Sequence, residues 1–181
     1  MADVSVRAAR QDDSADVARV QAAAWRSAYG DVLPPELLSA VSGQDSVATW
    51  QAAIERPPSP RHRLLVALEG TAVAGFASVV PASDADLDPG EDLEIQALYV
   101  MPEHAGQGHG SRLVNAIGDL ATEDGVGLVI AWVSEQEAGL ERLLTGAGWA
   151  ADGAARRLDW RGDGQVLVRQ TRLVTRIGAG S

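Results

Sequence analysis

The sequence contains neither cysteine nor lysine, and these two absences exclude several kinds of chemistry. Without cysteine the chain can form no disulfide, no thiolate nucleophile and no cysteine-based zinc site. Without lysine it has no Schiff-base chemistry and no P-loop lysine, and all 15 of its basic residues are arginine. A G-x-S-x-G sequence is also absent, so nothing supports a serine hydrolase of the α/β-hydrolase kind.

Basic segments and long apolar runs are scarce as well. The first residues lack a basic stretch followed by an apolar one, and no apolar stretch reaches the length that spans a bilayer. We therefore expect no signal peptide and a cytoplasmic protein. The 15 basic residues face 25 acidic ones, which gives a formal net charge of −10. This charge disfavours nucleic acid and anionic membranes as partners and would attract cationic small molecules or amine-bearing peptides.

The length of 181 residues fits a single domain over 1–181. Hydrophobic periodicity and turn signals predict the order strand, helices, three strands, helix, strand, helix, two strands. The strands are expected at 4–7, 62–68, 72–80, 93–100, 126–133, 154–160 and 165–175. The unit at 93–133 implies a right-handed parallel crossover. We therefore predict an α+β fold, an α/β mixed sheet of about seven strands with helices on both faces.

The most informative segment joins the fourth expected strand to a helix through the turn Gly106-x-Gly108-x-Gly110. Glycines let backbone N–H groups approach an anion, and the start of a helix adds unpaired donors and a favourable dipole. The turn is therefore a candidate phosphate cradle. A tight strand-to-helix connection with capping glycines is the alternative from the spacing alone. A Rossmann site would need G-x-G-x-x-G directly after the first strand, and another kind of nucleotide-binding protein is a weaker alternative.

The whole string around this turn closely resembles the acetyl-CoA-binding signature of the GNAT superfamily of N-acetyltransferases. It reads Leu98-Tyr99-Val100-x-Pro102-Glu103-x-x-Gly106-Gln107-Gly108-x-Gly110-Ser111-x-Leu113. The element order matches that superfamily over most of the chain. Trp25-x-x-x-Tyr29-x-x-x-x-Pro34, Trp132-Val133 and Gly148-Trp149 also stand where similar residues occur in the family. The resemblance implies a GNAT-like acyltransferase fold, with acetyl-CoA as cosubstrate and transfer of its acetyl group to a primary amine.

The same resemblance assigns roles to particular residues. Backbone groups of Leu98, Tyr99 and Val100 would bind the pantetheine arm of CoA as an added strand. The pyrophosphate would bind at Gly106, Gln107, Gly108, His109, Gly110 and Ser111. Glu94 would be the general base for the amine, although a solvated carboxylate at the strand end is an equal alternative.

The acceptor is expected to be an amine on a small molecule or a peptide. Trp25 and Tyr29 share one helix face and, by the resemblance, border its pocket. Aromatic residues at helical spacing more often pack in a core, and this alternative applies more strongly to Trp132. Dimers are common in the superfamily, so a homodimer is one oligomeric state that the resemblance implies.

Two positions depart from the family pattern. Ala105 stands where the phosphate loop usually begins with Arg or Gln, so we expect Gln107 or Arg112 to compensate and CoA to bind more weakly. Leu144 stands where many members carry the tyrosine that protonates the CoA thiolate, so that acid cannot be transferred to this chain and water would supply the proton. The alternative to an enzyme is therefore a non-catalytic acyl-CoA-binding or sensor module.

No metal site is expected. His104 and His109 are five residues apart and do not match the i, i+4 zinc pair, and His109 should either contact phosphate or face solvent. Asp84-x-Asp86-x-Asp88 resembles the start of a calcium loop, but Pro89 replaces the required glycine and Ile95 the closing glutamate. We therefore expect residues 81–92 to form an exposed acidic loop that could rim a site for a cationic acceptor.

Overall fold

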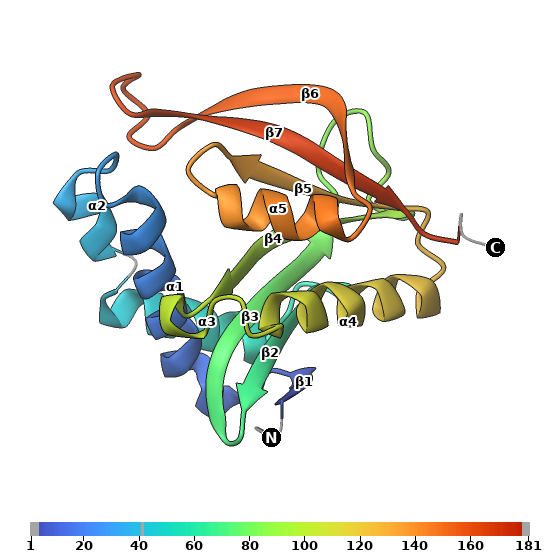
Figure 1. Ribbon diagram of the computed structural model, residues 1–181, viewed down its shortest axis with the longest axis horizontal. Coiled ribbons are helices and arrows are strands. Elements are labelled where there is room, and N and C mark those ends of the chain that lie inside the picture. Colours follow the sequence, from blue (N-terminus) through green and yellow to red (C-terminus); the bar gives the residue numbers. More distant parts are fainter. Residues whose placement is uncertain (1–3, 41, 179–181) are drawn as a thin grey trace.

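The computed structural model describes residues 4–40 and 42–178 and folds them around one mixed β-sheet (Figure 1). Its strands are β1 Val4–Ala8, β2 Arg63–Glu69, β3 Ala72–Pro81, β4 Asp92–Val100, β5 Leu128–Ser134, β6 Ala150–Asp159 and β7 Leu167–Arg176. Its helices are α1 Ser14–Tyr29, α2 Pro35–Ala40, α3 Gln44–Glu55, α4 His109–Glu123 and α5 Ala138–Gly146, with 3-10 turns η1 Gln11–Asp13 and η2 Pro102–His104. The predicted element order is confirmed.

The strands lie in the order β1-β2-β3-β4-β5-β7-β6, and every neighbouring pair is antiparallel except β4 and β5. The parallel pair is joined through α4, as the sequence pattern predicts. Strand β6 begins at Ala150, earlier than expected, because a register shift between Ala151 and Ala155 lets it pair with β7 on both sides of the irregularity. The predicted α+β class with seven strands is confirmed.

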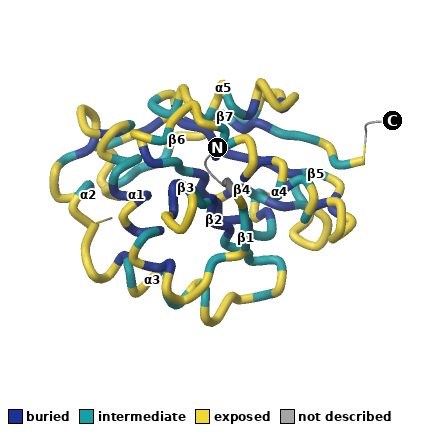
Figure 2. The backbone as a smooth tube through the Cα atoms, turned by 60° about the horizontal axis from the view of Figure 1, so that its bottom comes forward, coloured by how far each residue is buried: buried dark blue, intermediate teal, exposed yellow. Residues whose placement is uncertain are grey.

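Helices cover both faces of the sheet, as predicted (Figure 1). On one face the apolar stripe of α4, formed by Leu113, Val114, Ile117 and Ala121, packs with Leu144 of α5 against the strands. On the other face Val17 and Val20 of α1 pack with Phe76 of β3. Figure 2 shows the buried residues concentrated between these layers and the exposed ones in the outer turns. Among the described residues no helix has the length and apolarity needed to cross a bilayer.

Strands β4 and β5 separate about halfway along their length. They pair from Asp92 opposite Leu128 to Ile95 opposite Ala131, and no further. Beyond that point β4 stays paired to β3 as far as Val100, and β5 stays paired to β7 as far as Ser134. The facing backbone edges of β4 and β5 are therefore free to bind an extended, amide-bearing ligand.

Candidate active site

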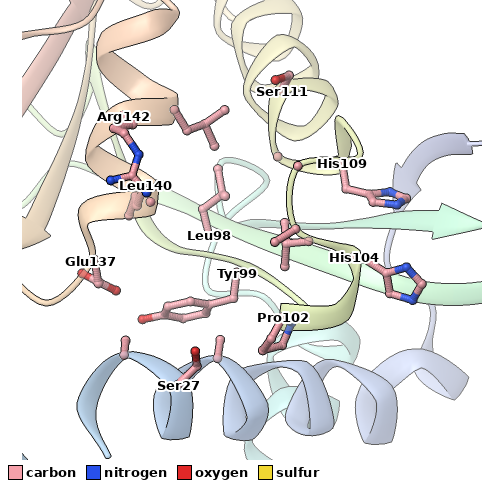
Figure 3. Close-up of a pocket in the computed structure, with 18 of the residues that line it drawn as sticks. Ser27, Leu98, Tyr99, Pro102, His104, His109, Ser111, Glu137, Leu140 and Arg142 are labelled. Carbon is pink, nitrogen blue, oxygen red and sulfur yellow. The ribbon is translucent and has the colours of Figure 1, made fainter. Parts of the chain in front are cut away.

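A cavity of about 750 Å³ opens where β4 and β5 separate. Its walls are the end of β4, the glycine turn and the start of α4, with α1 and α5 facing them (Figure 3). Most of the residues expected to bind the cofactor line it, namely Leu98, Tyr99, Val100, Gly106, Gly108, His109, Gly110 and Ser111. Gln107 does not, because its side-chain amide donates to the Glu103 carbonyl at 3.2 Å instead.

The glycines of the turn are required by backbone geometry and by crowding. Gly106 and Gly108 have φ values of +76° and +87°, the left-handed region that favours glycine. A Cβ on Gly108 would lie 2.8 Å from the Arg112 guanidinium, and one on Gly110 would lie 2.8 Å from Leu143 of α5. The sequence therefore uses glycine both to shape the turn and to bring α4 close to α5.

This turn delivers unpaired backbone donors to the cavity. The Arg112 N–H makes the first bond to a carbonyl four residues earlier, that of Gly108, at 3.1 Å. The N–H groups of His109, Gly110 and Ser111 precede it, and an α-helix offers no carbonyl partner to such groups. The helix dipole adds a positive potential at the same place. The arrangement suits a diphosphate, so the phosphate cradle expected from the sequence has the geometry it needs.

Glu94 lies on the face of the sheet opposite α4, just before the strands separate. Its neighbours Leu93 and Ile95 point into the core under α4, so the alternation of the strand turns Glu94 the other way. Burial raises the pKa of the Glu94 carboxyl; the charge of Arg156 lowers it, and that of Asp84 raises it. Glu94 is therefore a half-buried carboxylate with an elevated pKa, not a fully solvated one.

One irregularity marks the strand just after Glu94. Opposite β3 the register passes from Ile95 with Val79 to Ala97 with Ser78, which leaves Gln96 as an extra residue. Such β-bulges re-aim side chains and backbone groups and are frequent next to active sites. The bulge sits where the pairing with β5 ends, so a reacting group in the gap would meet irregular backbone.

Comparison with known proteins identifies the family. The family model described as Acetyltransferase (GNAT) family matches residues 22–149, which is most of the chain and includes the glycine turn. This chain belongs to the GNAT family. It is therefore an acetyltransferase, with acetyl-CoA as its cosubstrate.

Individual relatives agree with this assignment. The Bacillus subtilis protein described as the uncharacterized N-acetyltransferase YuaI is 28% identical over 133 residues, which are 74% of this chain and 73% of that protein. The fold is similar to that of the PaiA N-acetyltransferase of Thermoplasma acidophilum in complex with coenzyme A, with a TM-score of 0.76, 15% identity, and 96% and 99% of the two chains covered. It is also similar to YncA of Salmonella typhimurium with acetyl-CoA, with a TM-score of 0.70, 19% identity, and 99% and 96% covered.

Ala105 stands where the resemblance places an Arg or Gln at the start of the phosphate loop, and neither expected substitute lines the cavity. The Gln107 side chain is bonded to Glu103, and the Arg112 guanidinium donates to the Gln107 carbonyl at 3.3 Å outside the cavity. Instead Arg142, from the facing helix α5, lines the cavity (Figure 3). No motif marks this arginine in the sequence, because it approaches the turn only through the packing of α5 against α4.

Replacing Arg142 with Gln should weaken acetyl-CoA binding about fivefold to tenfold, since an exposed charge-assisted contact is worth roughly 1 kcal/mol. Isothermal titration with acetyl-CoA measures the change, and kcat should stay within about twofold because the guanidinium acts on the diphosphate rather than on the thioester. Arg176→Gln on the exposed end of β7 is the matched control and should leave Kd unchanged. Equal affinities for all three proteins would show that Arg142 does not serve the diphosphate.

His109 lines the cavity with its backbone only. Its side chain is 0% exposed and turns toward Glu69 of β2, with 3.6 Å between Nε2 and the carboxylate. Both the phosphate contact and the solvent exposure expected for this ring are therefore wrong. Figure 3 shows the rings of His104 and His109 on the side of the turn away from Glu137 and Tyr99.

Ion pairs with Arg172 hold the acidic loop at Asp84 and Asp86. Arg172 of β7 is only 6% exposed and forms ion pairs with Asp84 at 2.8 Å, Asp86 at 2.6 Å and Asp152 at 2.8 Å. Asp84 also accepts a hydrogen bond from the indole of Trp132 at 3.1 Å. The expected exposed loop is therefore correct for Asp86, whose side chain is 63% exposed, and wrong for Asp84, which is 16% exposed and whose charge acts on Glu94.

Trp132 is not a core residue, so the core packing that the sequence favours for it is wrong. Its ring is half-buried, with the Arg156 guanidinium 4.3 Å and the Arg172 guanidinium 5.7 Å from its centroid. Arg156 is the same residue whose charge acts on Glu94. Trp132 therefore packs against charged groups on the Glu94 face of the sheet.

Trp25 and Tyr29 pack with Trp160 in an aromatic cluster, with ring centroids 4.7–6.0 Å apart. Neither lines the cavity, and Tyr29 is only 2% exposed, so the packing alternative describes them better. Their neighbours Ala24, Ser27 and Ala28 line the cavity instead. The border role of the pair stays a prediction.

Two positions, one in α5 and one just before it, differ in their burial and in their chemistry. Leu144, where many GNAT members have tyrosine, is fully buried in the core under α4. Glu137 lines the cavity just before α5, and the Tyr99 hydroxyl points toward it (Figure 3). Burial raises the pKa of Glu137, against hydrogen bonds from the Ser134 N–H, Tyr29 and Tyr99 that lower it. Sequence reasoning missed this carboxyl because only the fold brings the two tyrosines to it.

Proposed function

We propose that this chain transfers the acetyl group of acetyl-CoA to a primary amine by direct attack, with Glu94 as the general base and with residues 1–181 acting as one domain. The observation that supports this most is the position of Glu94, a half-buried carboxylate with an elevated pKa at the point where β4 and β5 separate. A raised pKa makes the carboxylate a stronger base toward the proton of the amine.

The reaction proceeds in one displacement. The amine nitrogen attacks the thioester carbonyl, its proton passes to Glu94 directly or through water, and the carbon–sulfur bond breaks. Backbone N–H groups near Leu98 or Tyr99 polarise the carbonyl oxygen. The CoA thiolate leaves and takes its proton from water, since the buried Leu144 offers none. The products are the N-acetylated amine and free CoA.

Acetyl-CoA occupies the cavity in this proposal. The diphosphate binds at the N–H groups of the glycine turn, and Arg142 faces it from α5. The pantetheine arm runs along β4 from Leu98 to Val100, where the strand edge is not paired with β5. The acceptor approaches from the Glu94 face, between the acidic loop and β6.

Initial rates measured while acetyl-CoA and an amine are both varied should give intersecting double-reciprocal lines, the pattern of a sequential mechanism. The acceptor is first found by following release of the CoA thiol over polyamines, aminoglycosides, amino acids and peptide N-termini. Parallel lines, or an acetyl-enzyme trapped after quenching, would contradict direct attack. Binding of acetyl-CoA with no turnover on any amine would favour a sensor module instead.

A further inference from the structure

Three side chains to which the proposed reaction assigns no role meet beside the glycine turn, where one of them, His104, also lines the cavity. Glu69 is the last residue of β2, His104 lies in η2, and His109 is the first residue of α4. The Glu69 carboxylate oxygen Oε2 is 2.7 Å from His104 Nδ1 and 3.6 Å from His109 Nε2. One ligand atom from each residue lies within 4.8 Å of the other two.

These atoms are close without being hydrogen-bonded to one another. Across residues 4–40 and 42–178 no group bonds Glu69 Oε2, His104 Nδ1 or either ring nitrogen of His109, although all four atoms are buried. The short distance from His104 to Glu69 therefore lacks the angles of a hydrogen bond. Buried polar atoms left without a partner cost free energy, so the lone pairs that converge here call for an explanation.

We propose that Glu69, His104 and His109 bind a zinc ion through one carboxylate oxygen and two imidazole nitrogens. Ligand atoms of tetrahedral zinc, at bonds of about 2.0–2.1 Å, lie about 3.3 Å from one another. The observed separations of 2.7 Å and 3.6 Å bracket that spacing, and rotation of the two rings brings their nitrogens to it. A metal would satisfy His109 Nε2, which the fold holds in the interior.

The donor set selects zinc over the commoner hard cations. Imidazole nitrogen suits zinc, whereas magnesium and calcium prefer oxygen ligands. The His104 and Glu69 side chains are 28% and 29% exposed, which gives the ion a path from solvent and leaves room for water as the fourth ligand.

Such a site links the β2–β3 hairpin to the start of α4. Glu69 precedes the hairpin turn at Gly70, and His109 opens the helix whose first N–H groups face the cavity. A bound ion therefore stabilises the folded chain, because the unfolded chain does not hold the three ligands together.

Isothermal titration of ZnCl₂ into tag-free, chelator-treated protein should show one ion per chain, and zinc should raise the Tm. Glu69 and His104 are partly exposed, so the fold should tolerate their replacement. Glu69→Gln and His104→Gln should each weaken zinc binding at least about 10–100-fold, since even the loss of a residue that only supports a ligand has an effect of this size. Both should also abolish the rise in Tm. His109→Asn should do the same where it folds.

His62 supplies the matched control. It is the one other histidine of the chain. Its Nδ1 lies 2.9 Å from Ser59 Oγ, outside the cluster. His62→Gln should bind zinc as the parent does, and MgCl₂ should produce no binding heat. The proposal is overturned by absence of stoichiometric zinc binding, by full retention of it in both Glu69→Gln and His104→Gln, or by equal binding of magnesium.

Discussion

Replacing Glu94 with Gln is expected to lower kcat/KM by about 10²–10³-fold, the contribution of a positioned general base. Gln keeps the shape of the side chain but replaces one acceptor oxygen with an NH₂ donor, so it cannot take the proton of the attacking amine. Because the base acts in the transition state rather than in cofactor binding, Kd for acetyl-CoA should change by less than about twofold. Initial rates with the acceptor varied at saturating acetyl-CoA give kcat/KM, and titration with acetyl-CoA gives Kd.

The pH profile distinguishes a base from a merely structural carboxylate. Burial raises the pKa of Glu94, so the group is protonated and inactive at low pH and becomes active as the pH rises through that pKa. The parent should therefore lose activity on the acid side, and Glu94→Gln should lose this acid limb along with most of its rate. A rise that belongs to the amine itself should remain in both proteins.

The control for Glu94 comes from the same segment. Glu91 is an exposed glutamate in the loop before β4, and Glu91→Gln should keep both the rate and the pH profile of the parent. If Glu94→Gln keeps an unchanged acid limb, the proton goes elsewhere, and Glu137 becomes the carboxyl to test because it lines the cavity, which Glu94 does not, and its pKa is also raised.

Local patterns explain why so much of the fold and of the cofactor site could be predicted. The glycine turn and the strand before it are contiguous in the sequence. Gly106 and Gly108 themselves indicate the left-handed backbone that the turn requires. The apolar spacing of α4 and the turn at Gly70 are equally local signals. Element order, sheet class and the cradle follow from such segments one at a time.

Features built from distant residues could not be read in this way. Arg172 lies 88 positions from Asp84. The sequence of the acidic loop does not indicate which arginine will pair with its carboxylates. The two histidines that flank the turn have the wrong spacing for a helical zinc pair, and their third partner comes from β2. Arg142 enters the cofactor cavity because Gly110 lets α5 pack closely against α4. Each of these contacts is decided by tertiary packing, which periodicity does not report.

Arg172→Met should destabilise the fold by about 2 kcal/mol at pH 7, below the roughly 3–5 kcal/mol of a fully buried pair because Asp86 and Asp152 are partly in solvent. Met fills a similar volume but leaves three carboxylates, two in the β3–β4 loop and one on β6, without their common cation. Urea unfolding measures the loss, and Tm should fall by about 4–8 °C. Arg169→Met, at an exposed position of the same strand, should stay within about 0.5 kcal/mol of the parent.

The pH dependence of that loss tests its electrostatic origin. Hydrogen bonds from Arg172 hold the pKa values of Asp86 and Asp152 below their ordinary value. A carboxylate with a depressed folded pKa stabilises the fold above its unfolded pKa of about 3.9, and this contribution disappears as the pH falls through the folded pKa. The gap between parent and Arg172→Met should therefore be largest near pH 7 and shrink below about pH 4. A gap of the same size at pH 7 and pH 3.5 would instead assign the loss to packing around the arginine stem, and the acidic loop would then be held beside Glu94 by shape rather than by charge.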